Sequence, residues 1–250
     1  MNLPIEQHNI EIQRNLEIWN KKPLLRLIYK NFYSEILKFI DKNISGKVVE
    51  IGSGIGNFKS VYPDCIATDI FPNPWIDKVE SAYSLSFPNN SISHLILFDV
   101  FHHLAFLGSA LREFKRVLAD EGRVIIFEPY ISPLGFFVYG IFHHEHIGLF
   151  KKINWINSKD ENLNAEYYAA QENATKIFGK NSKWKKEILK DWNIIYNKKY
   201  SAISHILSGG FSKPSLYPAG TLPFMQKIEK ILDLFPFLFA TRVMVVLEKK

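Results

Sequence analysis

Residues 48–56 read VVEIGSGIG, a short apolar run that leads into a turn rich in glycine. Such a run is typical of a parallel strand that is buried on both faces. The glycines allow the backbone to turn sharply and to approach a ligand closely. Free amides at the start of a following helix would face that ligand. We therefore predict a strand, a ligand-binding turn and a helix.

The spacing of the glycines argues against a dinucleotide ligand. A dinucleotide fingerprint needs glycines at positions one, three and six. Counted from Gly52, the glycines fall at one, three and five, and position six is Asn57. Glu50 lies two residues before Gly52, where a carboxylate suits a cation, such as the amino group of a methionine moiety, better than a pyrophosphate. Asp69 ends the next apolar run, where its carboxylate can accept hydrogen bonds from a ribose diol.

Short apolar runs and helical patterns alternate through the first half of the chain. Residues 65–67, 92–98 and 124–127 are apolar runs, and apolar residues recur at helical spacing from Leu104 to Leu118. Gly122 is expected to end that helix. Strands that alternate with helices predict an α/β fold with a parallel, doubly wound sheet.

Two regions flank or interrupt this pattern. Residues 1–45 are expected to form an N-terminal helical segment, in which Pro23 separates two helices. Residues 46–250 are expected to form the main domain. Within it, residues 131–215 are aromatic and basic with weak periodicity, and we interpret them as an inserted cap after the strand that ends at Glu128.

The C-terminal part of the chain returns to a regular pattern. Residues 222–235 are expected to form a helix and residues 242–247 a last strand. The apolar stretch 224–239 is expected to pack against the sheet, with peripheral membrane contact as the alternative. No stretch is suited to a transmembrane helix, and no secretory signal peptide is expected.

Four motifs together resemble the class I S-adenosylmethionine-dependent methyltransferases, in the ubiquinone/menaquinone-type (type 11) branch. They are VVEIGSGIG at 48–56, ATDI at 67–70, SLSFPNNSISHLILFDVFHHL at 84–104 and EFKRVLADEGRVIIFEP at 113–129. The resemblance covers about a third of the chain. It implies a Rossmann-like, seven-stranded sheet, mostly parallel with an antiparallel last strand, and S-adenosyl-L-methionine as cofactor.

The resemblance also implies which residues contact the cofactor, from its methionine end to its adenine end. They are Glu50, Gly52, Ser53 and Gly54 at the methionine end, Asp69 at the ribose, Ile70 against the adenine, Ser81 and Ala82 near the adenine amino group, and Asp99 and Val100 at the methyl-donor end. Two positions depart from the family pattern, because Ser81 and His94 stand where aspartates are usual. We interpret His94 as a structural change, and Ser81 or a backbone group is expected to replace the missing adenine contact.

His102 and His103 resemble the paired histidines of many relatives and are the candidate catalytic residues. A histidine beside the sulfonium could act as a general base, because its pKa lies near neutrality. Packing at a helix start is the alternative. Methyl transfer needs a base only if the acceptor loses a proton late, because much of the catalysis can come from alignment.

Other clusters are interpreted as minor features. Neighbouring histidines at 143, 144 and 146, with Glu145, do not share one helical face, so no metal site is expected. A lysine run over 180–190 resembles no nucleic-acid fold and is expected to be a solvated surface. The net charge of +6 is interpreted in the same way. The single cysteine, Cys65, favours a reducing, cytoplasmic setting.

The aromatic residues of 130–150 indicate the kind of acceptor. They predict an apolar or ring-shaped small molecule, or a lipid or glycan precursor. A nucleic-acid acceptor is not expected, because the Asn/Asp-Pro-Pro-aromatic motif of amino-group methylases is replaced by Asp-Val-Phe-His at 99–102. A non-catalytic scaffold subunit is the third alternative, and the oligomeric state is left open.

Overall fold

A computed structural model describes residues 4–141, 147–148, 151–156 and 168–250 of the chain. Its strands are β1 (Lys47–Ile51), β2 (Ile66–Asp69), β3 (Lys78–Val79), β4 (Ile92–Phe98), β5 (Leu118–Pro129), β6 (Trp192–Tyr200) and β7 (Arg242–Lys249). Its helices are α1 (Pro4–Lys21), α2 (Pro23–Leu37), α3 (Leu107–Val117), α4 (Pro133–Ile141), α5 (Asn173–Phe178), α6 (Lys185–Asp191), α7 (Ile203–Leu207), α8 (Leu222–Leu232) and α9 (Pro236–Phe239), with short 3-10 turns η1 (Asn57–Ser60), η2 (Phe101–His103) and η3 (Ala219–Thr221).

The strands form a seven-stranded sheet in the order β3-β2-β1-β4-β5-β7-β6. The pairs from β3 to β5 are parallel, whereas β7 is antiparallel to both β5 and β6. The predicted mostly parallel sheet with an antiparallel last strand is therefore confirmed. Because β1, β2, β4 and β5 are parallel, their carboxyl ends meet at one edge of the sheet.

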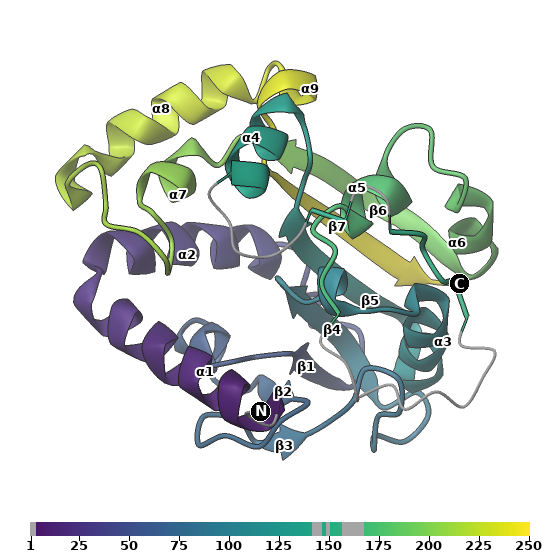
Figure 1. The fold of residues 1–250 in the computed structure, drawn as a ribbon. Coiled ribbons are helices and arrows are strands. Elements are labelled where there is room, and N and C mark those ends of the chain that lie inside the picture. The colour runs from purple at the N-terminus through teal and green to yellow at the C-terminus, as the bar shows by residue number, and fades with distance from the viewer. Residues whose placement is uncertain (1–3, 142–146, 149–150, 157–167) are drawn as a thin grey trace.

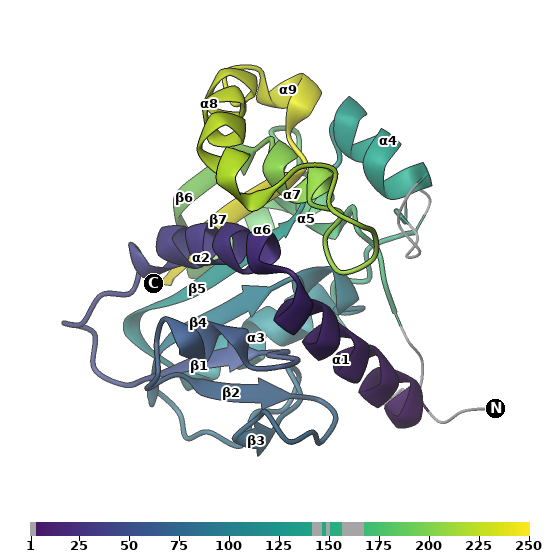
Figure 2. The ribbon, with the colours of Figure 1, turned by 90° about the vertical axis from the view of Figure 1, so that its left-hand side faces the viewer.

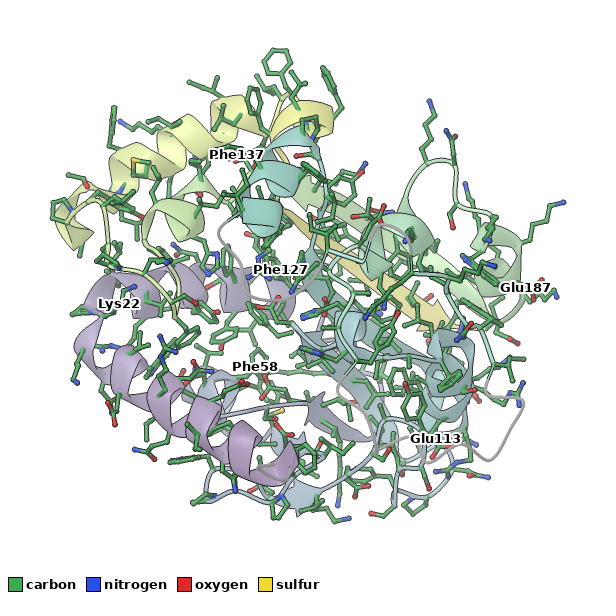
Figure 3. All side chains as sticks on the ribbon, in the orientation of Figure 1. Lys22, Phe58, Glu113, Phe127, Phe137 and Glu187 are labelled. Atoms are coloured by element: carbon green, nitrogen blue, oxygen red, sulfur yellow. The ribbon has the colours of Figure 1, made fainter. Side chains whose placement is uncertain are left out.

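Helices cover both faces of the sheet (Figure 1). On one face, α3, α5 and α6 pack over the inward residues of β1, β4, β5 and β7, such as Leu95 and Ile126. On the other face, α2 packs over Ile96, Ile125 and Phe127, and Phe58 and Phe127 lie inside this layer (Figure 3). Figure 2 shows α1, α2 and α8 on the same side of the molecule. Both faces of each central strand are therefore buried, which explains why these strands are mostly apolar along their length.

Several element boundaries differ from the sequence prediction. The predicted helix after the glycine turn is only the 3-10 turn η1, and Pro63 follows it closely and disfavours helical backbone at the preceding residue. Helix α3 ends at Val117 rather than near Gly122, because Leu118 already pairs with Ile92 in the sheet. Residues 192–200, predicted to lie in the inserted cap, form the edge strand β6.

The expected burial of the C-terminal helical region is wrong for its outer face. Helix α8 forms as predicted, and Pro236 starts the separate short helix α9. However, the side chains of Phe224 and Leu234 are 64% and 72% exposed, respectively. The inner face of α8 packs on α7 and α2, and its outer apolar residues are exposed to solvent.

None of the helices that the structure describes is long and apolar enough to cross a membrane.

Candidate functional site

The glycine turn after β1 lies at the carboxyl edge of the sheet and has left-handed backbone at its glycines. Gly52 has φ 66° and Gly54 has φ 53°. A β-carbon on Gly52 would lie 2.5 Å from a methyl group of Val100, so the turn packs directly against the end of β4. A β-carbon on Gly54 would meet no described atom within 4 Å. The turn therefore leaves open space above Gly54, where a ligand can approach the backbone.

Glu50, at the end of β1, is a buried acid with an unused acceptor. Its side chain is 4% exposed, and Oε2 has no hydrogen-bond partner among the described residues. Burial raises the pKa of Glu50 to about 8, and the nearby charge of Asp69 adds to the shift. Its backbone carbonyl is held by the hydroxyls of Ser53 and Thr68 at 3.2 and 2.7 Å. An unsatisfied buried carboxyl is costly, so this group is suited to a donor from a bound ligand.

Asp69 connects the end of β2 to the glycine turn. Its Oδ2 accepts the Gly54 amide at 3.0 Å and its Oδ1 accepts the Ile70 amide at 2.7 Å. These bonds orient the Asp69 carboxylate at the glycine turn, and a carboxylate oxygen can accept more than one hydrogen bond. Glu50, Gly52, Ser53, Gly54 and Asp69 are thus brought together as the sequence predicted.

The predicted adenine-side residues lie in the loop after β3. Ser81 forms an isolated bridge with Ser84, and its hydroxyl accepts the Tyr83 amide at 3.4 Å. Ala82 is buried against the core. Glu80, beside Ser81, does not supply the missing aspartate, because its carboxylate accepts hydrogen bonds from the amide and hydroxyl of Ser86.

His94 lies away from this edge, near the start of β4. Its Nε2 accepts the Asp41 amide at 3.0 Å. Burial lowers the pKa of His94 to about 4, so the ring is neutral at pH 7 and can serve as an acceptor. Its contacts attach the loop after α2 to the sheet.

Asp99, at the end of β4, has a partner that the sequence analysis missed. Both oxygens of Asp99 accept hydrogen bonds from the guanidinium of Arg242, one of them at 3.1 Å. Arg242 starts β7, is 4% exposed, and lies over the rings of Phe98 and Phe127. The charge of Asp99 raises the pKa of Arg242, so this arginine is charged at every relevant pH. In the sequence, Arg242 stands out as a single charged residue at the start of an apolar strand, and this feature could have marked it as a site residue.

Glu128, at the end of β5, was also missed as a site residue. It is fully buried and accepts the amides of Val100 and Phe101 at 2.7 and 2.6 Å, and its other oxygen lies 2.6 Å from Nδ1 of His102. This bond makes Nδ1 of His102 the donor. His103 instead points to the backbone carbonyl of Tyr168, at 3.0 Å from its Nδ1.

Asp99, His102 and Glu128 also have ligand atoms within 4.8 Å of one another, close enough to bind a metal ion. A metal would compete with the Arg242 guanidinium for Asp99, and Glu128 already accepts three hydrogen bonds. We therefore interpret Asp99 as the partner of Arg242 and Glu128 as the partner of His102, rather than the three residues as a metal site. The predicted cluster at His143 to His146 lies outside the described residues.

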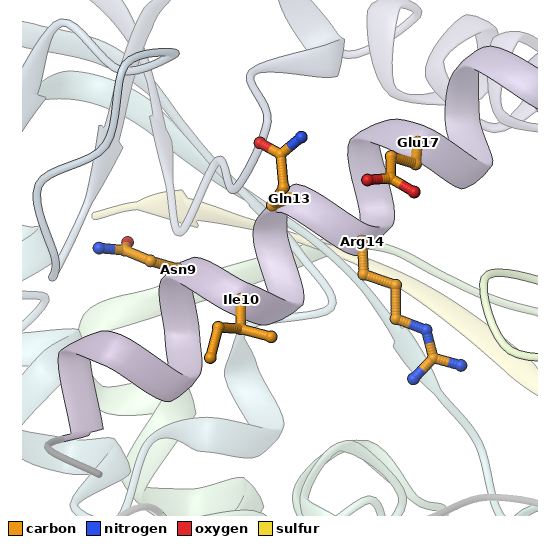
Figure 4. A pocket seen from close by; sticks show the side chains of 5 residues that line it. All are labelled: Asn9, Ile10, Gln13, Arg14 and Glu17. Atoms are coloured by element: carbon orange, nitrogen blue, oxygen red, sulfur yellow. The ribbon is translucent and has the colours of Figure 1, made fainter.

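Aromatic side chains of α2 pack on Phe98, the residue before Asp99. Tyr29 packs on Phe98 with ring centroids 5.2 Å apart, and Tyr33 packs on Phe98 at 5.5 Å. Both tyrosines are buried, and burial raises the pKa of each hydroxyl. A separate hollow of about 420 Å³ lies along α1, and Figure 4 shows its lining residues Asn9, Ile10, Gln13, Arg14 and Glu17. None of these α1 residues belongs to the site at the carboxyl edge.

Residues 49–126 match the family model of a methyltransferase domain. No curated protein matches the chain significantly. The structure is similar to an S-adenosylmethionine-dependent methyltransferase from Thermotoga maritima, described as a possible histamine N-methyltransferase, with TM-score 0.56, 13% identity and coverage of 96% of this chain and 99% of that chain. It is also similar to a methyltransferase from Haloferax volcanii in complex with a methyltransferase activator, with TM-score 0.55, 12% identity and coverage of 98% and 96%. A further similar structure is an S-adenosylmethionine-dependent methyltransferase from Archaeoglobus fulgidus, with TM-score 0.52, 15% identity and coverage of 90% and 94%. At these identities, the three structures establish the fold alone.

Proposed function

Because residues 49–126 form a class I S-adenosylmethionine-dependent methyltransferase domain of the type 11 branch, we propose that this chain methylates a small-molecule acceptor with an apolar or ring-shaped body, such as a lipid or glycan precursor. The observation that carries the proposal is the buried Glu50 carboxyl, whose Oε2 has no described partner, beside the open space at Gly54. The lone cysteine Cys65 is a buried free thiol, in keeping with the cytoplasmic location that we propose.

The residues at the turn fit two parts of the cofactor, its methionine ammonium and its ribose. Glu50 can accept a hydrogen bond from the cofactor ammonium, and Asp69 is a carboxylate at the end of β2, a group suited to accept from the ribose hydroxyls. When bound, the cofactor supplies a methyl group activated by a sulfonium. Arg242 neutralises Asp99 close to where a cationic cofactor would bind, and the remaining carboxyl groups of Glu50 and Asp69 give the site its acidic character.

An apolar acceptor is favoured by the surroundings of the carboxyl edge. Tyr29 and Phe98 pack beside the Asp99–Arg242 pair, and α4, rich in phenylalanine, follows β5 directly. The position of the lysine run of 180–190, away from the site, argues against a nucleic-acid acceptor. It precedes the start of β6, and Lys115 of α3 pairs with Asp191 there at 2.5 Å. This is the amino end of the parallel strands, opposite the site.

Calorimetric titration with S-adenosylmethionine and S-adenosylhomocysteine tests the cofactor, with NAD as control. We expect micromolar binding of both adenosyl ligands and none of NAD. Activity is then assayed on apolar ring compounds and lipid-linked sugars, with RNA and DNA in parallel. Methylation of nucleic acid alone would overturn the proposed acceptor, and absence of adenosyl-ligand binding would favour a non-catalytic scaffold.

Replacing the acid at the end of β2 tests the ribose contact. Asp69→Ala is expected to weaken S-adenosylmethionine binding about tenfold to 100-fold, because each hydrogen bond to a charged group is worth about 1.5–3 kcal/mol. The fold is expected to survive, as measured by circular dichroism. Asp77→Ala is the matched control, since Asp77 also accepts a backbone amide but pairs with the exposed Lys59. Equal affinity of folded Asp69→Ala and wild type would contradict the assignment.

The two histidines are distinguished by their different partners. If His102 is the base held by Glu128, His102→Gln is expected to lower kcat by about 100-fold or more. His103→Gln is expected to have a smaller effect, because His103 is directed to the Tyr168 carbonyl. Single-turnover rates at saturating cofactor check this. Unchanged kcat in a His102→Gln protein with lowered thermal stability would instead assign His102 to packing.

A further inference from the structure

The outer face of α8 combines apolar and basic side chains. Phe224, Lys227 and Ile231 follow one another at helical i, i+3, i+7 spacing, with Lys230 beside them, and Leu234 lies in the turn directly after the helix. All five are exposed, and Phe224, Ile231 and Leu234 are more than 60% exposed. The outer face of α8 therefore exposes large apolar side chains to solvent together with lysines.

The acidic residues of the same region point the other way. Glu229 accepts the amide and hydroxyl of Ser204, at 2.8 and 2.5 Å, and Asp233 accepts the Ser201 amide at 2.7 Å. These bonds fix both carboxylates against the start of α7. The outer face of α8 consequently presents cations and hydrocarbon without a described carboxylate beside them.

Helices α9 and α4 extend this face. The hydroxyl of Ser132 donates to the Leu238 carbonyl at 3.0 Å, so the start of α4 is held on α9. Phe237 of α9 is 66% exposed, and Phe136 and Phe137 of α4 are 48% and 52% exposed. Helix α4 contacts α9, and α9 lies between α4 and α8 in Figure 2, while Figure 3 labels Phe137 on α4. These residues and the outer face of α8 form one surface, called here the docking surface.

We propose that the docking surface binds an anionic lipid bilayer. A basic face with protruding phenylalanine and leucine is the composition of helices that lie in a membrane interface. The lysines would contact anionic headgroups, and each lysine would raise partitioning onto the bilayer about fivefold. Protein interfaces, in contrast, are depleted in lysine at their cores. The helices α8 and α9 form an outer layer of the molecule, where a flat bilayer can reach them (Figures 1 and 2).

The docking surface is attached to the site by short connections. Helix α4 follows the end of β5, which carries Glu128, and α9 precedes β7, which begins with Arg242. Binding through α4, α8 and α9 would therefore place the carboxyl edge of the sheet near the lipid headgroups. This inference stands on exposed residues outside the site and does not depend on which acceptor is methylated.

Vesicle sedimentation with the full chain tests the inference. We compare vesicles of phosphatidylcholine alone with vesicles of equal parts phosphatidylcholine and phosphatidylglycerol, and expect binding to the second kind. Lys227→Gln/Lys230→Gln should lower partitioning about 25-fold. Phe224→Ser/Phe237→Ser should lower it by about tenfold or more for each phenylalanine, because each ring would leave hydrocarbon.

Matched controls distinguish binding through the docking surface from non-specific binding to vesicles. Lys185→Gln/Lys186→Gln removes two exposed lysines of α6, and Val79→Ser removes an apolar side chain, 54% exposed, on β3. Both controls should bind anionic vesicles as wild type does. Wild-type protein that binds neither vesicle, or surface variants that bind as wild type, would overturn the inference. So would a dimer that these variants convert to monomer without any vesicle binding, since the surface would then be a contact between copies.

Discussion

A Glu50→Gln protein is expected to bind S-adenosylmethionine about 100-fold more weakly than wild type and yet to be more stable when empty. Glutamine keeps the size of the side chain but cannot form the charge-assisted bond to the ammonium, which is worth up to about 3 kcal/mol. The empty wild-type protein bears the cost of a buried carboxyl whose Oε2 has no described partner. Titration calorimetry and chemical denaturation measure the two effects.

The pH dependence of this effect has a definite sign. The pKa of Glu50 is raised to about 8 in the folded protein, above its ordinary value of 4.5. The free energy of unfolding should therefore fall as pH rises from about 4.5 to 8, and Glu50→Gln should stabilise most at pH 8. The ligand ammonium favours the charged form of Glu50, so below pH 8 ligand binding releases a proton from Glu50. Below pH 8, affinity should rise by up to about tenfold per pH unit in wild type, and Glu50→Gln should lose this dependence.

Glu229→Gln is the matched control for this experiment. Burial also raises the pKa of Glu229, but its carboxylate is bonded to Ser204 on α7, away from the glycine turn. Its substitution should leave S-adenosylmethionine affinity unchanged. Unaltered affinity and an unaltered pH profile in Glu50→Gln would remove the central observation behind the proposed function.

Asp99→Asn is expected to lower the free energy of unfolding by about 3–5 kcal/mol. Asparagine retains the shape and tolerates the left-handed backbone at this position, where φ is 57°. It removes the charge that balances Arg242, which is 4% exposed and cannot lose its proton. Urea denaturation measures the loss.

The double variant Asp99→Asn/Arg242→Met tests the cause. Replacing both charges removes the unpaired buried cation, so most of the lost stability should return. If the double variant is as unstable as Asp99→Asn alone, the ion pair is not the source of the effect. S-adenosylmethionine affinity of the double variant also tests the predicted cofactor contact of Asp99, because a purely structural pair would leave it near wild type.

The parts of the site that lie close together in sequence could be predicted from it. Glu50 and the glycine turn fall within a few residues, and Asp69 ends the next strand, so the local pattern of strand, turn and acid already fixes their proximity. The parallel sheet followed from the alternation of apolar runs with helical stripes. The glycine spacing excluded a dinucleotide without any knowledge of the structure.

The rest was decided by contacts between distant segments. Arg242 meets Asp99 across 143 residues, and Glu128 reaches His102 only because β4 and β5 end side by side. The edge strand β6 mixes apolar and charged residues without a clear strand periodicity, so its sequence did not predict a strand. Its pairing with β7 makes it one. The apolar residues of α8 predicted burial, but α7 and α2 cover only the side of α8 that carries Leu222 and Glu229. Apolar periodicity determines that a helix forms and which faces differ, whereas only tertiary packing determines which face is covered, because burial depends on what lies opposite.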